Sequence, residues 1–337
     1  MERQTVEVEH IVRESIPLKK GHNNGQVLRI LTYHRIARRE DFAFLNPRLI
    51  SASPEMFYRQ MRHLKRHYHV MSAEEVLMAI DNSASIPPRS VMITFDDGYV
   101  DFKIHAWPIL KKFGLPVTLF VPTGFPGRPE RSFWWDRLYR AFKKAREERS
   151  DERLLKSLPI ALTDTSLSSL KSLQEYLKSF AYNELLGAVE DICSPFEEEG
   201  QTYTSVLDWD ELAELARQGV ALGPHTRNHA ILKELSEEDI ENEIRGSMDD
   251  LERQIGSVLP IFCSPNGGDD DRVVNILRDV GIRLAFGTRD GHNKWSAMDL
   301  LRLKRTNITP RTKLTIFKLR LLKSMGYVDR LRHRTWN

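Results

Sequence analysis

A run of apolar, strand-forming residues that ends directly in two carboxylates and a glycine constrains the fold more than any other feature of this chain. The run covers residues 91–95, and Asp96-Asp97-Gly98 follows at once. Similar runs occupy residues 28–33 and 117–121, and a helical pattern at 102–113 precedes the latter. Strands that alternate with helices at such short intervals pair in parallel through helical crossovers. The order therefore predicts an α/β fold with a parallel sheet.

The same alternation resumes beyond residue 207. Asp208 is a favourable helix N-cap, and Glu211 stands three residues later as its capping-box partner. Ser236 is expected to begin a long amphipathic helix, and residues 54–67 to form another. Further strands are predicted at residues 220–224, 261–262, 282–286 and 301–303.

Between these two parts, residues 126–206 follow a different pattern. Charged, helix-favouring segments such as 141–156 and 167–180 replace the alternation of strands and helices. We expect this stretch to be a mainly helical insertion in a domain that covers residues 27–310. Residues 1–26 form a predicted N-terminal extension, and residues 311–337 a basic C-terminal helix or tail.

Side chains with catalytic chemistry follow two of the predicted strands. Asp96 and Asp97 come after the first, and His225 and His229, four residues apart, come after the strand at 220–224. Loops that follow the strands of an α/β barrel converge on one face, so these four side chains should meet in space. Carboxylates and imidazoles together suit a divalent metal ion, and the second carboxylate is left as a base. The set predicts a metal-dependent hydrolase.

The segments Thr94-Phe95-Asp96-Asp97-Gly98 and His225-Thr226-Arg227-Asn228-His229 resemble the first two motifs of the polysaccharide deacetylase family, carbohydrate esterase family four. The resemblance extends over about residues 28–310 and implies a distorted (β/α) barrel. It also implies that Asp97, His225 and His229 bind one divalent metal ion, and that Asp96 is the general base for a metal-bound water that attacks an amide carbonyl. Zinc is the expected metal, and cobalt, nickel, iron or manganese would suit the same ligands.

The third family motif, Arg-x-Pro-x-Gly, is present in altered form as Cys263-Ser264-Pro265-Asn266-Gly267. Pro265 should preserve the turn, and the backbone N–H of Asn266 is a candidate oxyanion donor. The last motif, Leu-x-His, would supply the general acid, but residues 301–305 contain no histidine. His34, and after it His292, are the candidates to replace it.

Aromatic residues near these motifs are candidates for contact with the substrate. Tyr99 follows the first motif, and Phe133-Trp134-Trp135 stands near the start of the insertion. The cluster either packs the insertion onto the barrel or, through Trp135, forms a wall on which a sugar ring stacks.

Charge and cysteine content limit the partners and the location. The formal net charge is only +3 and no recognition motif accompanies it, so we expect no nucleic-acid partner. Two widely spaced cysteines, and residues 1–20 without the apolar core of a signal peptide, predict a cytoplasmic protein. The basic tail either packs on the barrel or contacts an anionic membrane surface.

Together these features predict an enzyme that removes the N-acetyl group from an amino sugar of an oligo- or polysaccharide. A cytosolic or membrane-linked glycan precursor is the expected substrate. Two alternatives stay open. One is an amidohydrolase that acts on a non-sugar amide, because barrels are reused across substrates. The other is a glycan-binding protein without catalysis, which the altered third and last motifs suggest.

Overall fold

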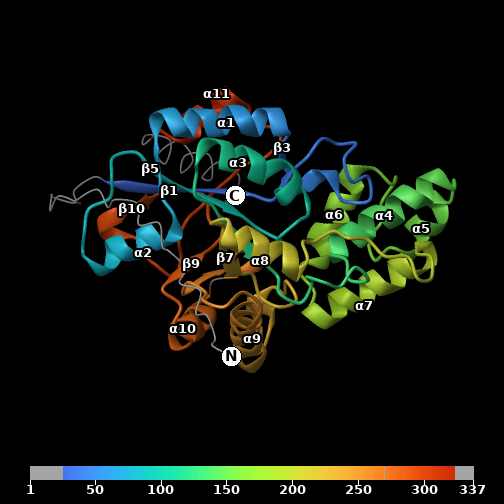
Figure 1. Ribbon diagram of the computed structural model, residues 1–337. Helices are drawn as coiled ribbons and strands as arrows, with labels where there is room; N and C mark the ends of the chain where they lie inside the picture. Colours follow the sequence, from blue (N-terminus) through green and yellow to red (C-terminus); the bar gives the residue numbers. More distant parts are fainter. Residues whose placement is uncertain (1–25, 269, 323–337) are drawn as a thin grey trace, which may run out of the picture.

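The computed structural model describes residues 26–268 and 270–322, and a mostly parallel sheet forms its centre (Figure 1). Strands β1, β5, β6 and β7 lie side by side in that order, and each pairs with the next in parallel. Their bounds are Val27–Tyr33, Ser90–Phe95, Thr118–Val121 and Ala221–Pro224. The predicted α/β fold with a parallel sheet is confirmed.

Short strands extend this sheet. The strand β4 (His69–Val70) pairs with β5, and β11 (Thr306–Asn307) pairs with β1, both in parallel. The strand β10 (Asn293–Lys294) pairs with β1 in the antiparallel direction. The strands β2 (Arg35–Ile36) and β3 (Ile50–Ala52) form a separate pair. None of these short strands follows from the sequence pattern.

A second parallel pair, β8 (Ile261–Cys263) and β9 (Leu284–Phe286), continues the curve of the sheet beyond β7. The strand predicted at residues 301–303 is wrong, because only Leu303 forms a ladder pair, a single bridge to Phe286. The residues before it turn instead: the Asp299 side chain accepts a hydrogen bond from the Leu301 N–H. This turn sets where the following residues meet the sheet.

Helices surround the strands (Figure 1). The capping box predicted for Asp208 and Glu211 is present at the start of α8, and Ser236 caps α9 as expected. A second capping box, Ser72 with Glu75, begins α2, which the sequence analysis did not predict. The helices outside the insertion are α1 (Pro54–His67), α2 (Ala73–Asp81), α3 (Trp107–Phe113), α8 (Trp209–Arg217), α9 (Glu237–Ile255), α10 (Asp271–Asp279) and α11 (Leu314–Arg320).

The stretch predicted to be helical, residues 126–206, contains four helices that group at one side of the sheet (Figure 1). They have a hydrophobic core of their own, in which Leu138, Leu170 and Leu185 are buried together. Tyr99 and Leu45 from outside the insertion join that core, so the insertion is packed against the barrel. The four helices are α4 (Trp134–Glu147), α5 (Asp151–Ser157), α6 (Leu167–Leu177) and α7 (Tyr182–Cys193).

The C-terminal helix α11 packs beside α1, with Phe317 fully buried in the same core as Leu64. The remainder of the basic tail and all but the last residue of the predicted N-terminal extension lie outside the described residues. Within the described part of the chain, no helix is both long and apolar enough to cross a bilayer.

Candidate active site

The carboxyl ends of the parallel strands deliver the predicted site residues to one face. Asp96 and Asp97 follow β5, His225 follows β7, and His34 follows β1 directly. All four line one cavity of about 420 Å³, together with His229. The expectation that residues so distant in sequence would meet in space is confirmed.

The backbone at this face adopts unusual conformations. Asp97 has a φ of 74° and His229 a φ of 55°, in the left-handed region that side chains other than glycine seldom occupy. The strand that carries His225 requires a glycine, because a Cβ at Gly223 would lie 2.7 Å from the ring of Phe120 on the neighbouring strand. Strained backbone of this kind persists where the surrounding fold fixes it, and it concentrates at functional sites.

Three buried donor atoms converge at the predicted metal site. The Asp97 Oδ1 atom lies 3.2 Å from His229 Nε2 and 3.6 Å from His225 Nε2. Within the described residues this oxygen accepts no hydrogen bond, although it is buried. An unpaired buried carboxylate oxygen facing two imidazole nitrogens is costly unless a cation completes the group. Asp97, His225 and His229 therefore fit a divalent metal ion.

The orientation of His225 suits metal binding. Its Nδ1 atom lies 2.6 Å from the Cys263 carbonyl oxygen, which can only accept, so Nδ1 carries the proton and Nε2 keeps its lone pair. Burial lowers the pKa of His225 to about 4, which keeps the imidazole neutral at physiological pH.

Arg305 orients Asp96, the predicted base. Its Nη1 and Nη2 atoms donate to both oxygens of Asp96, at 2.8 and 2.7 Å, and both side chains are almost fully buried. Burial by itself would raise the pKa of Asp96, but the Arg305 guanidinium outweighs it and holds that pKa well below its usual range. Asp96 is therefore a fixed, ionised carboxylate.

Arg305 was not predicted as a site residue from the sequence. The residue lies two positions beyond Leu303, in the segment that was compared with Leu-x-His. The sequence shows a basic residue there but gives no sign that it pairs with Asp96. Its remaining donors bind Gly287 O at 2.8 Å and Thr94 Oγ1 at 3.2 Å, so the whole guanidinium is held in place.

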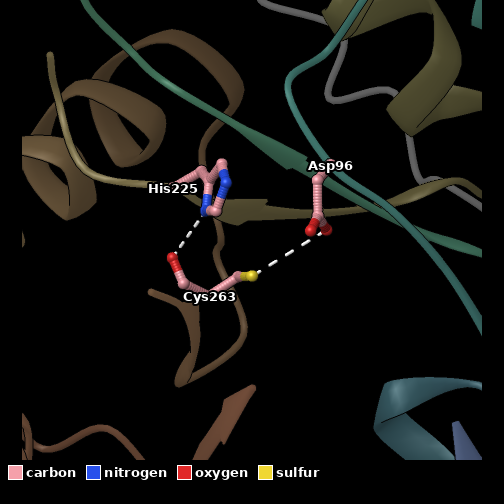
Figure 2. A group of neighbouring side chains, drawn as sticks. All are labelled: Asp96, His225 and Cys263. Atoms are coloured by element: carbon pink, nitrogen blue, oxygen red, sulfur yellow. Dashed lines mark hydrogen bonds between the residues drawn. The ribbon is translucent and has the colours of Figure 1, made fainter. Parts of the chain in front are cut away.

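Cys263, which stands where the family motif has arginine, lies between His225 and Asp96 (Figure 2). Its carbonyl oxygen orients the histidine, and its Sγ atom lies 3.8 Å from Asp96 Oδ1. Burial raises the pKa of this thiol well above its ordinary value, so the sulfur is a neutral neighbour of the base.

The other predicted residues fall into two groups. His34, Asn266 and Trp135 line the cavity, whereas Pro265 is buried in the turn beside it. His292 is not in the cavity lining, and its Nε2 lies 3.0 Å from the Arg320 carbonyl oxygen of α11. Of the two histidines considered as proton donors, only His34 faces the site.

Tyr99 is fully buried behind the cavity wall, which contradicts a direct contact with substrate. Its hydroxyl accepts a hydrogen bond from Trp135 Nε1 and donates one to Asp136, both at 2.8 Å. Burial raises the pKa of Asp136 to about 6. The Trp135 ring, held in this way, lies edge to face with His229 at a centroid distance of 4.7 Å. The aromatic cluster therefore both packs the insertion and forms a wall of the cavity.

Comparison with known proteins places this site in a family. The family model for polysaccharide deacetylases matches residues 84–285, which include Asp96, Asp97, His225 and His229. A poly-β-1,6-N-acetyl-D-glucosamine N-deacetylase of Staphylococcus aureus is 31% identical over 134 residues. That match covers 36% of this chain and 46% of the relative, so it spans less than half of the relative's length.

Solved structures share the fold. The deacetylase PplD of Streptococcus pyogenes, in complex with acetate, has a TM-score of 0.59 at 22% identity and covers 88% of this chain and 99% of its own. IcaB from Ammonifex degensii has a TM-score of 0.57 at 19% identity, and the match covers 88% of this chain and 98% of IcaB. At these identities the likeness shows the fold, which confirms the distorted (β/α) barrel expected from the sequence.

Proposed function

Because this chain belongs to the polysaccharide deacetylase family, we propose that it hydrolyses the N-acetyl group of an amino sugar in an oligo- or polysaccharide. One observation carries the proposal: a three-residue metal-ligand set and a separately held carboxylate share one cavity. The printed activity of the relative from Staphylococcus aureus, an N-deacetylase of a polymer of N-acetylglucosamine, supports the class of substrate.

Asp97, His225 and His229 would hold the metal ion, with zinc as the default and cobalt, nickel, iron or manganese as alternatives for the same ligands. A divalent cation bound there would act as a Lewis acid that lowers the pKa of water and polarises the amide carbonyl. The chain supplies the rest of the chemistry. His225 enters as a neutral ligand, and the Trp135 ring packs against one side of His229.

Asp96 accepts the proton of the attacking water. The bidentate contact with Arg305 keeps the carboxylate ionised and fixes both of its oxygens, so the base needs no reorganisation as the proton arrives. Because Arg305 rather than the metal ligands neutralises Asp96, the base and the ligand Asp97 keep separate roles.

His34 returns a proton to the leaving amine. It follows β1 directly and lines the cavity together with Asp96 and Asp97. The backbone N–H of Asn266, in the turn after β8, is the proposed donor to the oxyanion. Both assignments rest on position in the cavity.

The position of Trp135 also bears on the alternatives. An amidohydrolase for a non-sugar amide would not need an aromatic wall beside the metal ligands, where Trp135 lies against His229. A binding protein without catalysis would not need a buried carboxylate locked by arginine, since such a pair is expensive to bury. Both features favour a deacetylase that acts on sugars.

The test combines metal content with acetate release. Dialysed wild type should contain about one equivalent of divalent metal, and His225→Ala much less, as measured by mass spectrometry. Asp96→Asn should retain the metal and lose at least about 10²-fold in acetate release from N-acetylglucosamine oligomers. Full acetate release from Asp96→Asn, or wild type that takes up no metal when zinc is supplied, would exclude the proposed mechanism.

A further inference from the structure

One face of helix α6, in the insertion, forms part of the wall of the active-site cavity. The side chains at positions i, i+3, i+4 and i+7 line it: Lys171, Gln174, Glu175 and Lys178. This spacing defines a single face of an α-helix. The adjoining face, with Leu170, Leu173 and Leu177, is buried in the core of the insertion. The insertion therefore contributes a row of long polar side chains to the cavity beside its aromatic wall.

Two hydrogen bonds fix this helix against the rest of the cavity. The Gln174 Nε2 atom donates to the Trp135 carbonyl oxygen at 3.3 Å, which ties α6 to the aromatic wall. Arg48, which also lines the cavity, donates from Nη1 to the Leu167 carbonyl oxygen at 3.1 Å. Leu167 lies one helical turn before Lys171, so the Arg48 guanidinium contacts α6 one turn away from Lys171.

The charges on this wall do not balance. Glu175 is the single acid, and it pairs with Lys178 at 3.3 Å. In the part of the chain that the structure describes, neither Arg48 nor Lys171 has a carboxylate within ion-pair distance. Both are exposed to solvent at the mouth of the cavity. Two unpaired cations beside a metal-ligand set raise the local concentration of anionic ligands.

We infer that Arg48 and Lys171 form an anion subsite that binds a carboxylate or phosphate group on the glycan that carries the acetylated sugar. The inference rests on the proposed function and names its substrate class: an acidic glycan rather than a neutral polymer of N-acetylglucosamine. An arginine fork and a lysine ammonium together suit either oxyanion.

The experiment compares three oligosaccharides of equal length with zinc supplied. One is a neutral N-acetylglucosamine oligomer, one alternates N-acetylglucosamine with glucuronate, and one carries a terminal phosphate. For wild type we expect kcat/KM for at least one acidic oligomer to exceed that for the neutral one by about tenfold, because two exposed ion pairs each contribute a few-fold. The uronate and phosphate arms identify which anion the subsite takes.

The variant Arg48→Gln/Lys171→Gln should lose this preference through a higher KM for the acidic oligomer. Lys171→Gln alone, which keeps the Arg48 contact to α6, should lose part of it and keep the wild-type melting temperature. Lys156→Gln is the matched control, since Lys156 lies on α5 of the same insertion, outside the cavity lining. Salt at about 1 M should also reduce the preference, because it shortens the screening length to about 3 Å.

Equal kcat/KM for acidic and neutral oligomers in wild type, or an unchanged preference in the double variant, would overturn the inference. Binding of the same oligomers to chelator-treated wild type, measured by calorimetry, separates this result from failure of the proposed function. If no oligomer releases acetate, the deacetylase proposal fails. Tighter binding of an acidic oligomer that depends on Arg48 and Lys171 would still support the subsite, and equal binding would refute it.

Discussion

Replacement of Arg305 by methionine tests whether this residue holds Asp96, the proposed catalytic base. The substitution removes a buried guanidinium and leaves the Asp96 carboxylate, whose side chain is 4% exposed, without its counter-ion. Breaking a buried pair from one side costs about 3 to 5 kcal/mol. With an unfolding entropy of about 2.1 cal/mol/K per residue over 337 residues, this corresponds to a melting temperature lower by about 4 to 7 °C.

The loss of stability in Arg305→Met should depend on pH in a defined direction. In wild type the folded pKa of Asp96 lies below its unfolded value, so the pair stabilises the fold above pH about 3.9 and is lost only as the pH falls through the lower folded pKa. In Arg305→Met the guanidinium is gone, so burial dominates and the folded pKa of Asp96 rises above its unfolded value. The stability difference between the two proteins should therefore be largest at pH values above this raised pKa. It should shrink as the pH falls from the raised pKa of the variant toward the lower folded pKa of wild type.

A double-mutant cycle isolates the pair. Asp96→Asn, Arg305→Met and the double variant should show a coupling energy of about 2 to 3 kcal/mol in thermal or urea unfolding. Activity should fall about 10²-fold in Arg305→Met, because a misplaced base costs that much even when it is chemically intact. The matched control is Arg302→Met, whose ion pairs lie at the surface and should cost about 1 kcal/mol or less.

A role of Arg305 in holding Asp96 would be refuted if Arg305→Met melted within about 1 °C of wild type and kept its activity. It would also be refuted if the effects of the two single substitutions simply added in the double variant, because independent residues show no coupling energy.

Three further predictions concern the surroundings of the site. Tyr99→Phe removes the acceptor for Trp135 Nε1 in a buried position and should cost about 1 to 3 kcal/mol in thermal unfolding; an unchanged melting temperature would argue against this network. His34→Gln should lower kcat by about 10² or more with metal content unchanged, and a wild-type kcat would exclude His34 as the proton donor. Cys193 and Cys263 are both buried, and burial raises the pKa of Cys193 to about 12, so neither thiol should react with a thiol reagent until the protein unfolds. Rapid labelling of the folded protein would contradict the last prediction.

Much of the fold could be predicted because its signals are local. The capping box of Asp208 and Glu211 acts across three residues, and the strand before Asp96 is a continuous apolar run. The arrangement of parallel strands then places Asp96, Asp97, His225 and His229 at one face, since the carboxyl ends of such strands meet there. The placement of these four residues follows from the strand order alone and requires no knowledge of side-chain contacts.

The sequence by itself determined the alternation of strands and helices, the candidate metal-ligand set and the residue that follows each strand. Only the tertiary structure decided that Arg305 binds Asp96 across 209 positions of the chain, that Tyr99 lies behind the wall, and that α6 turns Lys171 toward the cavity. Capping and strand formation depend on neighbours within a few residues, whereas these contacts depend on how the sheet curves and where the insertion docks. That geometry is fixed by the packing of whole elements, which no short stretch of sequence encodes.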